Sequence, residues 1–139
     1  MISDKPKDSY KGTKYTVIHC EGALDSYNTA INSVDRRRHK SFTRQMIIQI
    51  ERLANGGRMT NENFPQEGDL PKRKGQHHIK KFRALKRIPI RGYCWLSEQH
   101  KDTYYISHYV HKDYDKLKDS DIKKVGKNWS RIEENGDER

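Results

Sequence analysis

The 139-residue sequence lacks any long apolar segment. Its longest aliphatic run, Met46–Ile48, is far too short to cross a bilayer, so we predict no transmembrane helix. The N-terminal stretch 1–14 is rich in lysine and aspartate and has no apolar core, so we also predict no signal peptide. Together these absences predict a cytoplasmic protein that has no membrane partner.

Cysteine is scarce as well. Cys20 and Cys94 lie 74 positions apart, and the sequence holds no Cys-x-x-Cys pair. Small secreted domains that depend on disulfides use many more cysteines, and structural zinc sites need grouped ligands. We therefore predict two buried thiols that form no disulfide. The length fits one domain over 1–139, with flexible ends over 1–13 and 136–139.

The common enzyme motifs are also missing. The sequence contains no GxxxxGK[ST] phosphate loop, no GxSxG serine and no HExxH zinc pair. His108 and His111 are three positions apart, and in a strand such residues point to opposite faces of the sheet. We therefore expect these two histidines to hold no metal ion, and we predict no cofactor.

Acidic residues are absent from one long segment. The chain has 29 Lys and Arg against 19 Asp and Glu, a formal net charge of +10. Segment 72–91 holds nine cations and no acid: Lys72, Arg73, Lys74, Lys80, Lys81, Arg83, Lys86, Arg87 and Arg91. So dense a field of one sign favours an anionic partner, and nucleic acid is the commonest. A surface that merely keeps the protein in solution is the alternative.

Hydrophobic periodicity predicts an α+β fold. We predict four strands, over 14–20, 78–87, 91–98 and 103–112. We predict three helices, over 24–34, 41–54 and 119–135. Ser41 is the expected N-cap of the second helix, which Asn55–Gly57 closes, and a loop follows as far as residue 75.

The element order β-α-α-β-β-β-α predicts a helical hairpin on one face of a mostly antiparallel four-stranded sheet. Cations and histidines lie among the apolar residues of the last three strands, so we expect the other face to be open to a ligand. Alternation places His108 on one face of its strand and His111 on the other, although a one-residue bulge would exchange them. A half-buried structural role is the alternative for His108.

Residues 82–117 resemble a known family. A basic strand is followed by an aromatic strand that opens with arginine, RGYCW at 91–95, and by a last strand and lysine cluster that run YYISHYVHKDYDKLKDSDIKKV from residue 104. With the helical hairpin before it, this pattern resembles the RelE/HigB branch of the RelE/ParE superfamily of bacterial and phage toxins. The similarity covers about residues 15–132. It implies a RelE-like fold with a C-terminal helix and a cognate antitoxin protein as partner.

The resemblance also implies an activity, that of a metal-independent endoribonuclease (mRNA interferase). Such a toxin cleaves mRNA, free or on the ribosome, by attack of the substrate's own 2′-hydroxyl. This reaction needs an acceptor for the hydroxyl proton, an acid for the leaving oxygen and cations at the phosphate. The candidate catalytic residues are Arg91, His108, His111, Lys112 and Tyr114.

The candidate RNA-binding residues combine the basic segment with two aromatic side chains that share a face with Arg91: Arg73, Lys80, Lys81, Arg83, Lys86, Arg87, Tyr93 and Trp95. For Tyr93 and Trp95 a place in the core is an equal alternative. The alternative functions are a non-enzymatic nucleic-acid-binding protein, a ParE-like gyrase inhibitor of the same fold, and an unrelated basic phage or ribosome-associated protein.

Overall fold

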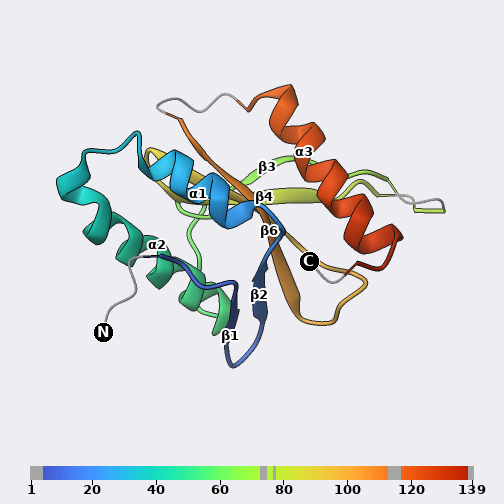
Figure 1. Cartoon of the computed structure of the whole chain (residues 1–139). Helices are drawn as coiled ribbons and strands as arrows, with labels where there is room; N and C mark the ends of the chain where they lie inside the picture. The colour runs from blue at the N-terminus through green and yellow to red at the C-terminus, as the bar shows by residue number, and fades with distance from the viewer. Residues whose placement is uncertain (1–4, 73–74, 77, 113–116, 138–139) are drawn as a thin grey trace.

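A computed structural model of the chain describes residues 5–72, 75–76, 78–112 and 117–137. They form a six-stranded sheet with three helices (Figure 1). The strands are β1 Ser9–Lys11, β2 Thr16–His19, β3 Gln66–Asp69, β4 Lys81–Arg87, β5 Ile90–Leu96 and β6 Thr103–His111. The helices are α1 Ala23–Ile31, α2 His39–Ala54 and α3 Asp119–Trp129, with a 3-10 turn, η1 Arg36–Arg38, before α2 and a π-helical turn, η2 Ser130–Glu134, after α3. The predicted α+β class is confirmed.

The layout of the sheet differs from the prediction. Its order is β1-β2-β6-β5-β4-β3, and all neighbours are antiparallel except β2 and β6, which run parallel. Two strands were not predicted from the sequence: β1 lies in the N-terminal stretch and β3 in the expected loop. Both are short and mostly polar, so pairing with a neighbouring strand defines them rather than a pattern of their own.

Helices α1 and α2 cover one face of the sheet, as predicted for the helical hairpin. Tyr27 of α1 and Met46 of α2 join Leu85 of β4 in one buried cluster. The Tyr27 hydroxyl and the Thr43 hydroxyl, 2.6 Å apart, connect the two helices. Helix α2 begins at His39 rather than after Ser41, because the η1 turn leads directly into it.

The opposite face is covered as well, and the predicted open face is therefore wrong. Helix α3 lies over it (Figure 1), and Val125 and Trp129 of this helix share a second buried cluster with Phe82, Tyr93 and Trp95. The alternating side chains of β4 and β5 are thus apolar on both faces, which requires a helix on each.

A β-bulge in β6 decides which way His108 points. Tyr93 of β5 pairs with His108, but the next residue, Cys94, pairs with Ile106, so Ser107 is the extra residue on β6. The sequence analysis named such a bulge as an alternative to simple alternation, and the bulge exchanges the faces of the residues beyond it. His108 consequently lies on the α3 side of the sheet, and His111 alternates to the α1 side.

The predictions about the two cysteines and about membrane-spanning helices can be compared with the structure directly. Cys20 and Cys94 are both buried and form no disulfide, as predicted. Burial raises the pKa of the Cys94 thiol to about 12, because a thiolate there would lose its hydration. Within the described residues, no helix has both the length and the apolar content that a membrane span requires.

Candidate functional site

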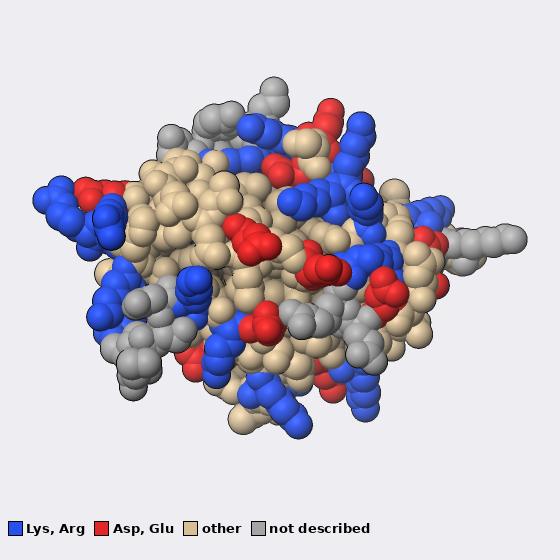
Figure 2. All heavy atoms as spheres, viewed as in Figure 1, with Lys and Arg blue, Asp and Glu red and all other residues tan. Residues whose placement is uncertain are grey.

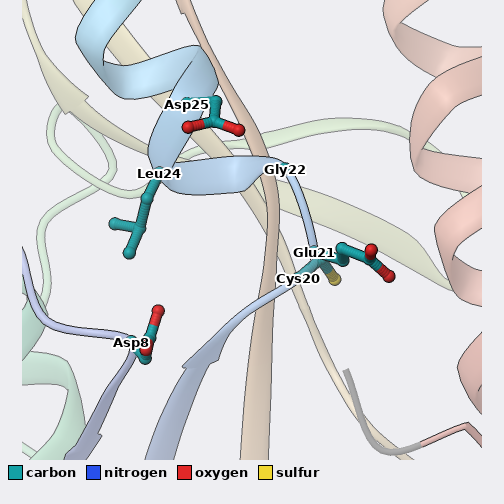
Figure 3. Close-up of a pocket in the computed structure, with 6 residues that line it drawn as sticks. All are labelled: Asp8, Cys20, Glu21, Gly22, Leu24 and Asp25. Atoms are coloured by element: carbon teal, nitrogen blue, oxygen red, sulfur yellow. The ribbon is translucent and has the colours of Figure 1, made fainter.

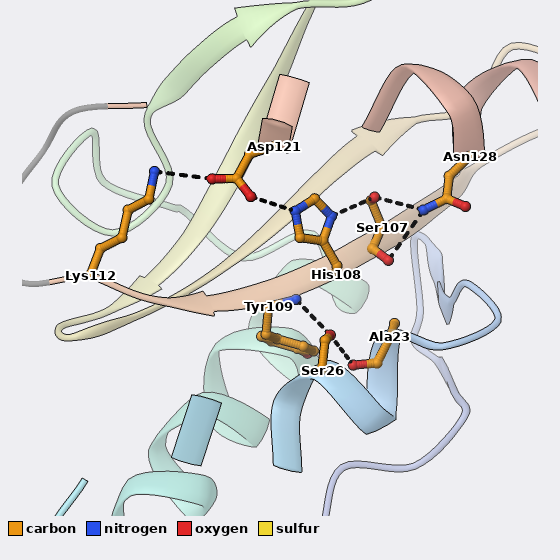
Figure 4. A network of polar contacts seen from close by, with 8 residues as sticks. All are labelled: Ala23, Ser26, Ser107, His108, Tyr109, Lys112, Asp121 and Asn128. Atoms are coloured by element: carbon orange, nitrogen blue, oxygen red, sulfur yellow. Dashed lines mark hydrogen bonds and ion pairs between the residues drawn. The ribbon is translucent and has the colours of Figure 1, made fainter. Parts of the chain in front are cut away.

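A chain of buried polar contacts connects β6 to α3 (Figure 4). His108 is at its centre: its Nε2 is 3.1 Å from Asp121 Oδ1, and its Nδ1 is 2.8 Å from Ser107 Oγ. Lys112 Nζ lies 3.1 Å from the other carboxylate oxygen of Asp121. At the far end, the Asn128 side-chain amide donates to Ser107 Oγ at 2.8 Å. Both ring nitrogens of His108 are therefore engaged.

The local sequence explains why these residues meet. The bulge at Ser107 turns His108 toward α3 and sets Ser107 beside it. Asp121 and Asn128 are seven positions apart on α3, so two helical turns bring them to the same side of the helix. Val125 lies between them and packs into the apolar cluster. The polar contacts thus lie on the buried face of α3, alongside its apolar anchors.

The network is almost closed to solvent, since His108 is 2% exposed and Lys112 4% exposed. Burial alone would raise the pKa of Asp121, but the hydrogen bonds from His108 and Lys112, together with their charge, outweigh burial and hold that pKa below its usual value. Asp121 is therefore a carboxylate at neutral pH and neutralises the buried lysine.

A second buried ion pair lies on the same face. Arg91 of β5 is 1% exposed, and its Nη1 is 3.7 Å from Glu67 Oε1 of β3. The Lys112 ammonium lies over the ring of Tyr93, 5.7 Å from its centroid. Three of the predicted catalytic residues, Arg91, His108 and Lys112, are thus on the face that α3 covers. Of the other two, His111 lies on the α1 side of the sheet, and Tyr114 lies outside the described residues.

A cavity of about 670 Å³ borders this network between α1 and α3. Its charged and ionisable lining residues are Asp25, His108, His111, Lys118, Asp121 and Lys124. His111 is half-buried, whereas Lys118 and Lys124 are exposed at the start of α3. On the other wall lie Ser26 and Thr29 of helix α1 and Ser33, which follows the helix. The cavity therefore combines both predicted histidines with two lysines and two carboxylates.

The predicted RNA-binding cations do not line this cavity. Lys80 is paired with Glu98, and Lys81 Nζ is 2.6 Å from Asp69 Oδ1. On the α2 side of β4, Arg83 donates to the Phe64 carbonyl at 2.9 Å, and Arg87 contacts Gln45 and lies over the ring of Phe42. Lys86 alternates to the α3 side, opposite Arg91. Arg73 lies outside the described residues. The described cations of segment 72–91 therefore point to both faces of the sheet, and several of them are engaged in contacts inside the protein.

The prediction that two aromatic side chains stack on RNA bases needs correction. Tyr93 and Trp95 are 0% and 1% exposed. The helix above them, α3, inserts Trp129 and Val125 into the same cluster, so no base can reach either ring. Both residues belong to the core, which is the alternative that the sequence left open.

Sequence reasoning missed three residues of the network, Ser107, Asp121 and Asn128, and also Glu67 of the second ion pair. The sequence predicted a helix that begins at residue 119, and so placed Asp121 in its first turn, but it did not indicate which residues that turn contacts. The spacing of Asp121, Val125 and Asn128 was a usable signal, because it places two polar residues beside an apolar one on a single helical face.

Another cavity, of about 450 Å³, opens beside the start of α1 and includes Asp8, Cys20, Glu21 and Asp25 (Figure 3). Figure 3 shows the Glu21 and Asp25 carboxylates pointing in different directions. Across the part of the chain that the structure describes, no group of three or more His, Cys, Asp or Glu is placed to hold a metal ion.

Comparison with known proteins adds no relative. No family model, no curated protein and no solved structure matches the chain. The function has to be inferred from the residues of the cavity and from the buried network behind it.

Proposed function

We propose that this protein is a metal-independent endoribonuclease of the RelE/HigB kind, and that the cavity between α1 and α3 is its cleavage site. One observation carries the proposal: the cavity brings His108, His111, Lys118 and Lys124 together beside a buried carboxylate. Cleavage by a substrate 2′-hydroxyl needs groups that move protons and cations that stabilise the phosphate. Histidine and lysine side chains supply both.

His111 is the better placed of the two histidines to transfer a proton. It is half-buried and lines the cavity, whereas both ring nitrogens of His108 are engaged by Ser107 and Asp121. We assign His108 a positioning role: through Asp121 it holds the first turn of α3, and with it Lys118 and Lys124, against the cavity. These two exposed lysines are the candidate phosphate contacts.

In this proposal, Arg91 and Lys112 do not line the cavity but support the residues that do. Each has a carboxylate within 4 Å, Glu67 for Arg91 and Asp121 for Lys112. Because both side chains are almost fully buried, we propose that they support Asp121 and the strands beneath it rather than touch the substrate. The rest of the proposal comes from the resemblance. The substrate is mRNA, free or on the ribosome, the partner is a cognate antitoxin, and the protein acts in the cytoplasm.

The test is cleavage of an RNA oligonucleotide by the purified protein, and of mRNA after induced expression. His111→Ala should lower the cleavage rate by roughly 10²–10⁴ and leave RNA affinity nearly unchanged. His78→Ala is the matched control, because His78 is an exposed histidine that does not line the cavity. A 2′-deoxy residue at the cut site should abolish cleavage and preserve binding, since phosphate contacts remain.

Cleavage of the 2′-deoxy substrate would overturn the proposed mechanism, and equal rates for the two histidine variants would remove His111 from it. A non-enzymatic nucleic-acid-binding protein, or a ParE-like gyrase inhibitor, is the second candidate. The observation that favours it is the presence of Asp25 and Asp121 in the cavity wall: carboxylates repel a phosphate, so they favour a protein that makes its contacts outside this cavity and cleaves nothing there. Tight RNA or DNA binding with no cleavage product would select this candidate.

A further inference from the structure

A second group of cations lies away from the cleavage cavity, where α2 begins. A cavity of about 370 Å³ there is lined by Lys5, Arg36, His39 and Lys40, with the hydroxyls of Tyr27 and Thr43. A neighbouring cavity of about 270 Å³ shares Lys5 and adds Lys7 and Arg44. In Figure 2, Lys and Arg gather at the end of the molecule where η1 joins α2. This cluster includes part of the sequence RRRHK at 36–40, which the proposed cleavage site does not use.

The cations along α2 have a regular spacing. Arg36 of η1, and Lys40 and Arg44 of α2, are each four positions apart, and within α2 this spacing keeps Lys40 and Arg44 on one side of the helix. Lys40 and Arg44 are separated by about 6 Å along the axis, from the helical rise of about 1.5 Å per residue. That separation is similar to the spacing of successive phosphates along an RNA strand. A row of this kind can contact consecutive phosphates of one strand.

The charges of this row are not neutralised within the protein. No acidic residue is among those that line the larger cavity, and Glu51 lines only the smaller one. The nearest acid in sequence, Asp35, accepts a hydrogen bond from the Arg37 side chain at 3.0 Å, and this bond lowers the pKa of Asp35. In the described part of the chain, neither Arg36 nor Lys40 makes a side-chain hydrogen bond or ion pair.

Some of the polar groups that line the larger cavity are held in place by hydrogen bonds inside the protein. Tyr27 and Thr43 present hydroxyl groups that are hydrogen-bonded to each other. The His39 ring is oriented by the contact of its Nε2 with the Val34 carbonyl, at 2.7 Å, so this nitrogen carries the proton and donates. Because the ring N–H and one of the hydroxyl protons are already used inside the protein, a phosphate bound here would be held mainly by the cations that line the cavity, Arg36 and Lys40. Ile31 also lines this cavity and Ile48 the neighbouring one, so the choice of a phosphate strand over a protein partner rests on the cations and not on an absence of apolar side chains.

We propose that Arg36, Lys40 and Arg44, with Lys5 and Lys7 beside them, form an RNA-backbone site, here called the α2 track. It lies outside the cavity between α1 and α3 and binds the strand through phosphates without reading its sequence. The choice of RNA over another polyanion rests on the proposed function. The track itself rests on the spacing, the two cavities and the charge described above.

The test measures binding of a fully 2′-O-methylated RNA 20-mer by fluorescence anisotropy over a range of salt concentrations. Because this RNA has no 2′-hydroxyl to attack, the result is independent of any ribonuclease activity. Arg36→Ala with Lys40→Ala removes two phosphate contacts. We expect affinity to fall roughly tenfold and the log–log salt slope to decrease by about 1.4, from about 0.7 per single-strand contact. Alanine is a good helix former and both residues are exposed, so the fold should persist.

The matched control is Lys123→Ala with Lys127→Ala, which removes the same charge from exposed positions of α3. It should change affinity and slope little. An equal loss in both double variants would overturn the proposal, because it would show dependence on net charge alone. Displacement of the RNA by a poly-glutamate peptide of equal charge, at equal concentration, would also overturn it and identify a surface for acidic proteins. If the Arg36→Ala, Lys40→Ala variant loses affinity as expected but the natural protein cleaves no RNA, the α2 track is supported and only the proposed ribonuclease activity is contradicted.

Discussion

His108 and Asp121 are separated by 13 positions in the chain, yet His108 Nε2 and Asp121 Oδ1 lie 3.1 Å apart in the interior. This contact connects the middle of the sheet to the first turn of α3. Because α3 forms one wall of the proposed cleavage cavity, the shape of that cavity depends on a buried carboxylate and its two partners, His108 and Lys112.

We predict that Asp121→Asn destabilises the protein at neutral pH by about 3 kcal/mol, since it breaks a buried ion pair and leaves the Lys112 charge uncompensated. The pKa of Asp121 in the folded protein is below its ordinary value of 3.8. A lowered pKa contributes stability that is fully present above the unfolded-state value and is lost as the pH falls through the folded-state value. Urea unfolding of both proteins should therefore show a difference at pH 7 that shrinks below about pH 3.8. A constant difference across this range would contradict the charge-based explanation.

Arg91→Ala should affect the fold as well as any activity. The substitution removes a buried guanidinium from beside Glu67, and the loss of one partner of a buried pair costs on the order of 3 kcal/mol. The additional change Glu67→Gln should recover part of that loss, since it removes the remaining charge. Urea unfolding of the single and double variants measures both effects. If Arg91→Ala unfolds at the same urea concentration as the natural protein but cleaves RNA poorly, Arg91 acts on the substrate and not on stability.

Tyr93→Phe should be neutral or stabilising by up to about 1 kcal/mol. The Tyr93 hydroxyl is buried and has no hydrogen-bond partner among the described residues, so its removal saves a desolvation cost. Burial also raises the pKa of Tyr93 far above the ordinary value of 10. The matched control is Tyr109→Phe, because the Tyr109 hydroxyl is 2.7 Å from His19 Nε2 in the interior. That variant should lose about 1 kcal/mol or more. Equal losses in the two variants would show that the Tyr93 hydroxyl is hydrogen-bonded.

The elements with a strong local pattern were predictable from the sequence. Helix α2 follows from the apolar spacing of Phe42, Met46, Ile50 and Leu53, all of which are buried. The hairpin of β5 and β6 follows from the polar link 99–102, where Asp102 takes the left-handed conformation that a tight turn needs. These features depend on residues close together in the chain, so a single sequence contains the information.

The features set by distant residues were not predictable. On β5, the alternation of Arg91, Tyr93 and Trp95 fits a ligand-binding face as well as a covered one, and only the position of α3 distinguishes the two. The bulge at Ser107 shifts every later side chain of β6 by one face. It brings His108 to the α3 side of the sheet, where the ring meets Asp121. No residue near Ser107 requires this shift. The sequence could therefore indicate that β6 carries site residues, but it could not predict which residues of α3 they contact.

The parallel pairing of β2 with β6 has a consequence for the way the chain folds. Thr16 of β2 pairs with Thr103 of β6, so β2 can pair with β6 only after the chain has been synthesised as far as Thr103. Contacts between residues so far apart require the closure of a long loop, and this slows folding. Until β6 leaves the ribosome, α1 lacks the strand that it mainly covers, and its apolar side stays exposed to other chains. The newly made chain is therefore most prone to aggregate before β6 has been synthesised.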